Sequence, residues 1–221
     1  MLAREYATSE RLERRRQNVT GWLRGEEAWG EALAAVAEVR PHRVLDAGCG
    51  DGLFTRVIAA PVVIGVDNAP AIVERAGSRG VDARLADIEK LPFGDGEFDV
   101  VVCNWTLYHL PDLDAGVREL ARVVRPGGRF VGIYNRDGHM EELWSRVRPQ
   151  ASVGEDYDEV LTRHFARVEH RDTEAYTLWE SRDDLQVFLD AFVEMMGPMV
   201  APEGAYPFKV TRRNRVYIAE K

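Results

Sequence analysis

The sequence predicts an α/β protein whose core is a doubly wound, mostly parallel sheet of seven strands, preceded by an N-terminal helical extension. Short apolar runs alternate with helical patterns between residues 41 and 136, as expected when helices connect parallel strands. Residues 62–66 and 98–103 are almost wholly apolar, which is typical of strands buried on both faces of a sheet. The length of 221 residues and the absence of an obvious linker favour one domain covering residues 1–221.

Residues 1–40 are predicted to form the helical extension and to act as a lid. They are polar at their start, and from about residue 9 to residue 39 apolar side chains recur at helical spacing. These side chains are Trp22, Leu23, Trp29, Leu33, Val36 and Ala37. Pro41 marks the end of the helical pattern.

Residues 41–136 carry the first five strands of the predicted sheet. These strands are expected at 44–45, 62–66, 81–86, 98–103 and 129–134. The helices between them are expected at 52–60, from Pro70 onwards, and at 112–124. Pro70 suits the first position of a helix, where no N–H is needed, and Pro126-Gly127-Gly128 ends the last of these helices.

Residues 137–221 form the C-terminal half, part of which is predicted to face a substrate. Its expected elements are helices at 139–147, 157–166 and 181–196 and strands at 168–179 and 214–220. Ser181 is the expected N-cap of the amphipathic helix that follows it.

Composition and charge argue against several classes of function. With 29 Lys and Arg against 37 Asp and Glu, the formal net charge of −8 opposes attraction to nucleic-acid phosphates. The first 16 residues lack the apolar core of a signal peptide, and no apolar run is long enough to predict a membrane span. Cys49 and Cys103 offer neither a disulfide framework nor metal-ligand spacing. We therefore expect a cytoplasmic protein without a metal site that acts on neither nucleic acid nor membrane.

The most informative segment is 44–52, with the sequence VLDAGCGDG. Its glycines let the backbone approach a ligand closely, and the N-terminus of the following helix would offer unpaired N–H groups. Asp67 follows the second strand, 19 residues after Gly48, where a carboxylate can accept hydrogen bonds from both hydroxyls of a ribose. The pattern predicts a nucleoside-containing ligand at the carboxyl ends of the strands of a Rossmann-like sheet.

The charge of this loop favours S-adenosylmethionine over a dinucleotide. A dinucleotide fingerprint has the register G-x-G-x-x-G. Counted from Gly48 and Gly50, its third glycine would fall at position 53, where this sequence has Leu53, so the third glycine, Gly52, is out of register. Asp46 and Asp51 would repel a pyrophosphate, whereas they would attract the sulfonium and ammonium groups of S-adenosylmethionine. An NAD(P)-dependent enzyme of the same fold is the alternative.

Four segments occur in a characteristic order: VLDAGCGDG, VIGVDNAP, ADIEKLPFGDGEFDVVVCNWTLYHL and RVVRPGGRFVG. Together they resemble the motifs of class I S-adenosylmethionine-dependent methyltransferases, and within these the small-molecule "type 11" domain family. The resemblance covers residues 43–134. It implies transfer of a methyl group from S-adenosylmethionine to a small-molecule acceptor, with S-adenosylhomocysteine as the product.

The resemblance also implies roles for residues at the methionine and ribose ends of the cofactor. Asp46, Gly48 and Gly50 would line the methionine end, and Asp67 would hold the ribose. Asn104, at the end of the fourth strand, would contact the methionine portion near the transferable methyl group.

The adenine would be held by three further residues. Asn68 would lie against the adenine or ribose, Asp87 would accept from the adenine amino group, and Ile88 would pack on its face. A lone Asp after a strand is also a common turn or cap residue, which is the alternative role for Asp87. Asp99 resembles a structural position and is left out of the site.

His109 is the candidate catalytic base, because it follows the strand end nearest the methyl group. A base is needed only when the acceptor must lose a proton. The alternative is that His109 caps or packs at the start of the next helix. His139 is a second candidate, with a surface position at a helix start as its alternative.

Aromatic side chains suit the walls of an acceptor pocket for a planar or apolar small molecule. The expected residues are Trp105, Tyr108, Tyr134, Trp144 and Tyr6. Residues 1–40 and 139–166 are expected to cover the site. Ordinary core packing is the alternative for these side chains, above all for Trp144.

Two other classes of function are alternatives for this sequence. A nucleic-acid methyltransferase is disfavoured, because Asn104 is followed by Trp105-Thr106 and Cys103 follows Val102 rather than proline. A non-catalytic S-adenosylmethionine-binding protein stays open, because its cofactor site would look the same.

Overall fold

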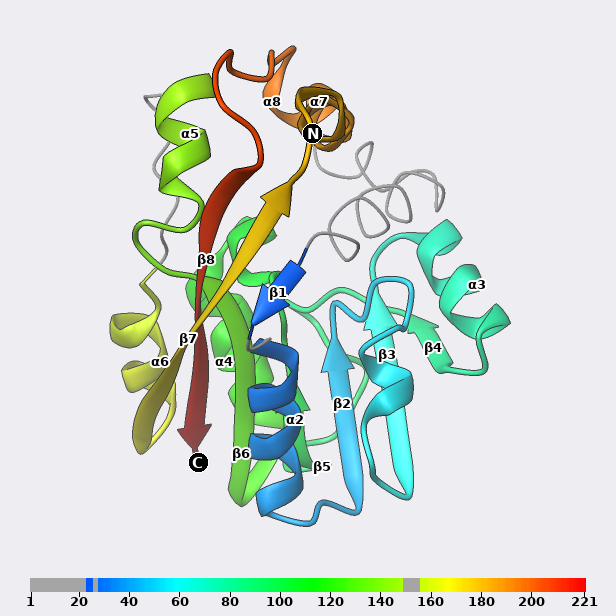
Figure 1. Ribbon diagram of the computed structural model, residues 1–221. Helices are drawn as coiled ribbons and strands as arrows, with labels where there is room; N and C mark the ends of the chain where they lie inside the picture. Colours follow the sequence, from blue (N-terminus) through cyan, green and yellow to red (C-terminus); the bar gives the residue numbers. More distant parts are fainter. Residues whose placement is uncertain (1–22, 26–27, 149–155) are drawn as a thin grey trace.

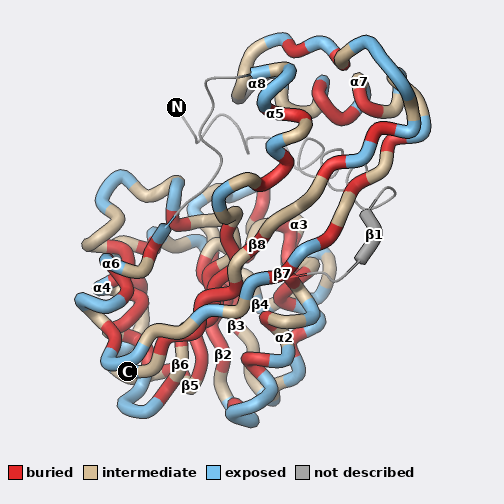
Figure 2. Tube along the Cα trace, turned by 60° about the vertical axis from the view of Figure 1, so that its left-hand side comes forward, coloured by how far each residue is buried: buried red, intermediate tan, exposed pale blue. Residues whose placement is uncertain are grey.

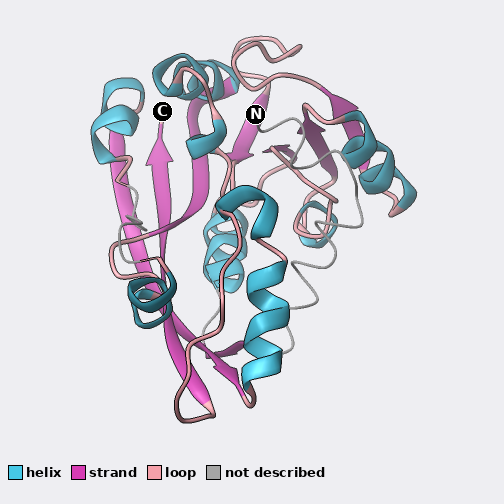
Figure 3. Ribbon diagram, turned by 90° about the horizontal axis from the view of Figure 1, so that it is seen from above, coloured by secondary structure: helices cyan, strands magenta, loops and turns pink. Residues whose placement is uncertain are grey.

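The computed structural model describes residues 23–25, 28–148 and 156–221, which build one eight-stranded sheet with helices around it (Figures 1 and 3). The strands are β1 (Leu23–Gly25), β2 (Arg43–Ala47), β3 (Val62–Asp67), β4 (Asp82–Leu85), β5 (Phe98–Val102), β6 (Val124–Asn135), β7 (Arg167–Trp179) and β8 (Phe208–Glu220). Their order in the sheet is β1-β7-β8-β6-β5-β2-β3-β4. The seven strands from β2 to β8 confirm the predicted doubly wound sheet.

Strand direction divides the sheet into two parts. β4, β3, β2, β5 and β6 run parallel to one another, whereas β8 lies antiparallel between β6 and β7. The short β1 adds an eighth strand by pairing with β7, with Leu23 opposite Thr177. The helical prediction for Leu23 is therefore wrong, because pairing with the exposed edge of β7 satisfies backbone groups there. Trp22 lies outside the described residues.

The helices cover both faces of the sheet. They are α2 (Ala28–Glu38), α3 (Pro70–Ser78), α4 (Leu113–Val123), α5 (Glu141–Val147), α6 (Asp158–His164), α7 (Arg182–Asp190) and α8 (Val193–Met196), with single 3-10 turns η2 (Thr55–Val57) and η3 (Leu107–His109). Neighbouring β2 residues alternate between two apolar clusters, with Val44 in the one that includes α2 and Leu45 in the one that includes α4 and α6. In Figure 1, α2 lies in front of the sheet and α4 behind it. This period-two alternation is what a sheet between two helical layers requires.

A third apolar cluster lies where β7 and β8 extend beyond the rest of the sheet (Figure 2). α5, α7 and α8 gather there around Trp179 and Phe208, which are both buried. Ser181 begins α7 with a capping box, as predicted: its side chain accepts from the Asp184 N–H, and the Asp184 carboxylate accepts from the Ser181 N–H. The predicted helix 181–196 is interrupted at Phe192, whose ring packs against Phe188 with centroids 5.0 Å apart.

The largest error in the element prediction concerns residues 52–60. No α-helix forms there, and the only helical structure is the 3-10 turn η2. Gly50 and Gly52 have φ angles of 54° and 78°, and Ile58 is already extended, so only a single turn fits between them. The helix N-terminus expected behind the glycine-rich loop is therefore absent.

Candidate functional site

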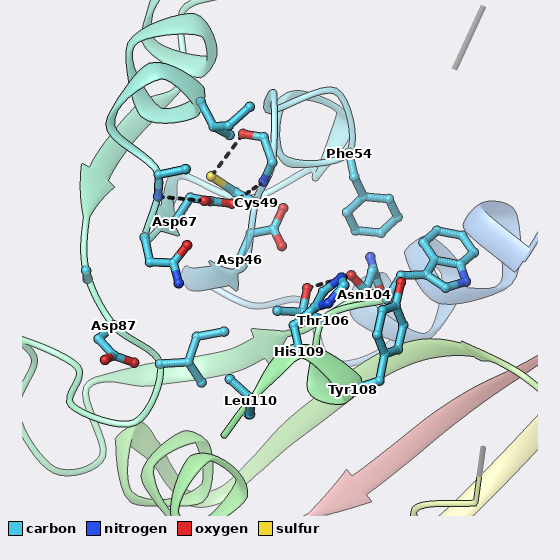
Figure 4. Close-up of a pocket in the computed structure, with 18 of the residues that line it drawn as sticks. Asp46, Cys49, Phe54, Asp67, Asp87, Asn104, Thr106, Tyr108, His109 and Leu110 are labelled. Carbon is cyan, nitrogen blue, oxygen red and sulfur yellow. Dashed lines mark hydrogen bonds between the residues drawn. The ribbon is translucent and has the colours of Figure 1, made fainter. Parts of the chain in front are cut away.

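A cavity of about 380 Å³ lies where β2, β3 and β5 end (Figure 4). The structure brings all nine predicted site residues to its lining: Asp46, Gly48, Gly50, Asp67, Asn68, Asp87, Ile88, Asn104 and His109. The described residues that line it fall between positions 29 and 111. The substrate-facing role of the C-terminal half stays a prediction.

The glycine-rich loop forms one wall of the cavity. Gly48 and Cys49 both donate their N–H to the Val66 carbonyl, at 2.8 and 2.9 Å, which folds the loop back over the end of β3. Gly48 has a φ angle of 79°, and a Cβ atom there would collide with the Thr106 side chain. The position therefore requires glycine on two counts, conformation and space.

Asp67 joins this loop to the start of α3. Its carboxylate accepts hydrogen bonds from the Gly50 and Ala69 N–H groups, both at 3.1 Å. Burial raises its pKa, and the backbone hydrogen bonds oppose that shift. Asp67 thus serves the loop itself as well as presenting a carboxylate to the cavity.

Asp46 is the second carboxylate of the site, and it is buried. Its side chain is only 2% exposed and accepts from the Thr55 hydroxyl at 2.7 Å. Asp51 is predicted to act with it, but it is not among the lining residues and instead forms an ion pair with Arg79. The prediction that Asp51 adds charge beside the ligand is wrong, because the φ of Gly50 and Gly52 turns that side chain toward α3.

Asn104 presents an amide at the end of β5. Its carbonyl oxygen accepts from the Ile133 N–H at 3.0 Å, while its buried Nδ2 has no hydrogen-bond partner among the described residues. An unpaired buried donor is costly, so a group that accepts from it is expected in the cavity.

Trp105 follows Asn104 in a conformation that non-glycine residues rarely adopt, with φ of 48°. Its N–H donates to the Ile133 carbonyl at 2.9 Å, and its indole N–H donates to Asn135 Oδ1 at 3.3 Å. The same oxygen accepts from Asn214 on β8 at 3.0 Å. The turn that carries Asn104 and Trp105 is thus held by two neighbouring strands.

The part of the cavity predicted to hold adenine is apolar with an acidic edge. Ile88 is 7% exposed and lies in the lining with Ile72 and Leu110. Asp87 is exposed and accepts from the Glu89 N–H at 2.9 Å, so it makes the turn contact that was its alternative role. Asn68 is also exposed at this edge.

His109 ends η3 and lies in the cavity lining beside Tyr108, with ring centroids 4.1 Å apart. Trp105 and Tyr108 line the cavity, as predicted. Trp29 and Phe54 also line it and were missed. In the sequence Trp29 is part of the helical pattern of residues 9–39, and Phe54 lies within the helix predicted at 52–60 that does not form, so neither pattern indicates a cavity.

Other aromatic and histidine predictions are wrong. Tyr134 is fully buried, and its hydroxyl donates to the Cys103 carbonyl at 2.5 Å. Trp144 packs in the third cluster against Phe192, with ring centroids 6.3 Å apart. His139 is neither on the surface nor in the cavity: it is buried, its Nδ1 is 2.8 Å from the Arg213 carbonyl oxygen, and burial lowers its pKa to about 3. Tyr6 lies outside the described residues.

Asp99 and Cys103 lie outside the cavity lining. Asp99 accepts from the His42 and Arg43 N–H groups and from Arg125, the structural role expected for it. Cys103 is buried, which raises the pKa of its thiol to about 12.

Among the described residues, no group of three or more His, Cys, Asp or Glu side chains could hold a metal ion. No helix of the described chain is long and apolar enough to cross a membrane.

The charge of the lining is strongly one-sided. Asp46, Asp67 and Asp87 supply three carboxylates, and the described lining residues include no Lys or Arg. Such a site attracts cationic groups and repels phosphates. This favours the sulfonium ligand over the dinucleotide even without Asp51.

Comparisons with known proteins agree with the sequence resemblance. Residues 45–132 match the family model described as a methyltransferase domain. The chain is 38% identical over 118 residues to the uncharacterized methyltransferase YcgJ of Bacillus subtilis (strain 168), and the aligned segment covers 47% of this chain and 46% of the relative. It is 39% identical over 114 residues to a ubiquinone biosynthesis O-methyltransferase of Xanthomonas oryzae pv. oryzae (strain PXO99A), covering 47% and 48%. The chain thus matches about half the length of these curated relatives.

Solved structures share the fold. The crystal structure of the Bacillus YcgJ protein superposes with a TM-score of 0.60 at 19% identity, covering 87% of this chain and 97% of that one. The N-methyltransferase NodS from Bradyrhizobium japonicum WM9, in complex with S-adenosyl-L-homocysteine, has a TM-score of 0.55 at 17% identity, covering 87% and 85%.

Proposed function

We propose that this protein transfers a methyl group from S-adenosylmethionine to a small-molecule acceptor, because residues 45–132 match the methyltransferase domain model. The observation that carries the proposal is the one-sided charge of the cavity, which combines three carboxylates with no Lys or Arg among its described lining residues. The same cavity includes the glycine-rich loop and the acidic end of β3 that the family resemblance singled out.

The residues present fit S-adenosylmethionine. Asp46 is buried and suits the ammonium group, while the unpaired Asn104 Nδ2 suits the carboxylate of the methionine portion. Gly48 and Gly50 line the cavity with φ angles of 79° and 54°, so backbone without a side chain faces the ligand at both positions. Asp67 would accept from the ribose hydroxyls, and Ile88 would pack on the adenine.

Positioning accounts for much of the catalysis that such a site can provide. When bound, S-adenosylmethionine supplies a methyl carbon to which the acceptor atom bonds as the carbon–sulfur bond breaks and its electron pair stays on sulfur, giving S-adenosylhomocysteine. The lining residues orient the two reactants and exclude water, which lowers the barrier for such a displacement. His109 is proposed to accept the proton of acceptors that must lose one.

The wider setting is part of the same proposal. A small-molecule acceptor is supported by relatives named as quinone-biosynthesis and malonyl-[acyl-carrier protein] methyltransferases. The formal charge of −8 disfavours a nucleic-acid acceptor. A cytoplasmic location is consistent with Cys49 and Cys103, two buried cysteines that are not joined in a disulfide.

Thermal unfolding with S-adenosylmethionine, S-adenosylhomocysteine, NAD and NADP, each alone, tests the cofactor. A ligand at a hundred times its dissociation constant adds about 2.7 kcal/mol, which raises the midpoint by roughly 5–10 °C. We expect a rise with the first two ligands only. A rise with NAD or NADP alone would overturn the proposal, and cofactor binding without turnover on any acceptor would leave a non-catalytic binding protein.

A further inference from the structure

The cavity has two chemically different halves. In Figure 4, Asp67 and Asp87 lie on one side, Phe54 and Tyr108 lie on the other, and Asp46 lies between them. If the function proposed above holds, the side with Asp67 takes the nucleoside. The side with Phe54 and Tyr108 is then left for the acceptor.

Aromatic rings from separate segments dominate the acceptor side. Trp29 on α2 packs edge-on against Phe54, which precedes η2, with ring centroids 5.3 Å apart and an interplanar angle of 86°. Trp105 and Tyr108 come from the turn after β5 and also line the cavity. We name Trp29, Phe54, Trp105 and Tyr108 the aromatic wall. The apolar residues expected to face adenine, Ile72, Ile88 and Leu110, are by contrast aliphatic.

Core packing alone does not explain the positions of Trp105 and Tyr108 in the aromatic wall. The Trp105 indole is held by its hydrogen bond to Asn135, at the cost of a φ angle of 48°. Tyr108 is 43% exposed although it lines the cavity. Strain and an exposed large ring at a cavity are typical of a binding surface rather than of a core.

The charge of the lining restricts what the wall can bind. S-adenosylmethionine carries two positive groups and one carboxylate, so its net charge of about +1 offsets only part of the three lining carboxylates. An acceptor with its own negative charge would be repelled, and the described lining holds no Lys or Arg to pair with it. Flat aromatic molecules without negative charge meet both conditions, since they stack on or pack edge-on against aromatic side chains.

We propose that the acceptor is a planar aromatic molecule without negative charge that binds against the aromatic wall, and that Trp29 is a specificity-determining residue. This proposal rests on the methyltransferase function proposed above. Trp29 lies outside residues 45–132, the part of the chain that matches the family model. Its contribution is therefore a property of this chain rather than of the shared cofactor-binding motifs.

Titration calorimetry on protein saturated with S-adenosylhomocysteine tests the proposal with three probes of one size. 2-Naphthol is planar and neutral, decahydro-2-naphthol has the same skeleton but is not planar, and 2-naphthoate is planar and anionic. We expect 2-naphthol to bind at least tenfold more tightly than either of the others. Trp29→Leu should weaken 2-naphthol binding five- to tenfold, Trp29→Phe should retain most of it, and both should bind S-adenosylhomocysteine within twofold of the natural protein.

Tyr176→Leu is the matched control, because Tyr176 is a partly buried ring on β7 outside the cavity lining. It should leave all four affinities unchanged. Equal or tighter binding of 2-naphthoate, an unchanged affinity in Trp29→Leu, or no binding of 2-naphthol to the saturated protein would each overturn the aromatic acceptor. Failure of S-adenosylhomocysteine itself to bind would instead overturn the proposed function, so the two failures are distinguishable.

Discussion

Replacing Arg79 by Met is expected to be one of the most destabilising single changes near the site. Arg79 forms an ion pair with Asp51, whose side chain is 1% exposed, and it also donates to the Asp51 carbonyl at 2.9 Å. The Arg79 side chain is itself only 19% exposed, so solvent screens the pair little. Removing one partner of a buried ion pair costs about 3–5 kcal/mol, because the other charge stays buried. At roughly 2–4 °C per kcal/mol for a chain of this size, the unfolding midpoint should fall by about 6–20 °C.

Calorimetric unfolding of three variants provides the assay. Arg118→Met is the matched control, because Arg118 is 63% exposed in its ion pair with Asp114 and should matter by less than about 1 kcal/mol. The double variant Asp51→Asn/Arg79→Met removes the uncompensated charge and should recover at least half of the loss. An Arg79→Met midpoint no lower than that of Arg118→Met would refute the reasoning, as would a double variant less stable than Arg79→Met alone.

Four further predictions concern the cavity and the core beneath it. Asp67→Asn should weaken S-adenosylhomocysteine binding at least tenfold, because an amide has only one acceptor oxygen for the loop N–H groups and the ribose; an affinity within twofold would remove Asp67 from the ribose site. Burial raises the pKa of Asp67 above its value in the unfolded chain, so cofactor binding should weaken as pH falls through that raised pKa. The stability of the free protein should instead fall as pH rises toward the same pKa, because the folded state then has to give up a proton that it holds more tightly than the unfolded chain does. Titrations of affinity and of the unfolding midpoint against pH check both signs, and Asp67→Asn should remove both pH dependences. His109→Ala should lower turnover by about 10²–10⁴ with cofactor affinity within twofold, and an equal loss of both would show a structural role. Tyr134→Phe should cost about 1–3 kcal/mol in denaturant unfolding, because the buried Cys103 carbonyl loses its donor; no loss would contradict the hydrogen bond.

The parallel core was predictable because burial on both faces leaves a direct trace in the sequence. Residues 62–66 and 98–103 are apolar at nearly every position, and both are strands. Ser181 was identifiable as a helix N-cap because capping depends on a local side-chain contact. The spacing of Asp67 from Gly48 placed both on one cavity, although the contact of either with a ribose is still a prediction.

The remaining features depend on backbone angles and on partners far away in the chain. The helix expected at 52–60 does not form because Gly50, just before it, and Gly52, at its start, have positive φ angles. Glycine adopts positive and negative φ angles about equally readily, so the sequence does not show which of them is used. The direction of the Asp51 side chain depends on Arg79. Tyr134 and Trp144 are aromatic residues of the core, and sequence alone does not distinguish them from Tyr108, which lines the cavity.

β8 lies in the interior of the sheet although it is the last strand in chain order. In the described sheet β7 pairs only with β8 and the short β1. It therefore cannot join the sheet through β8 until residues 208–220 have been synthesised. The same strand supplies Asn214, which bonds Asn135, which in turn holds the Trp105 turn. A nascent chain that still lacks β8 would therefore carry every residue of the glycine-rich motif without a finished cavity. Ligand-binding competence should emerge only after β8 has been synthesised, when its long-range pairing with β6 and β7 completes the sheet.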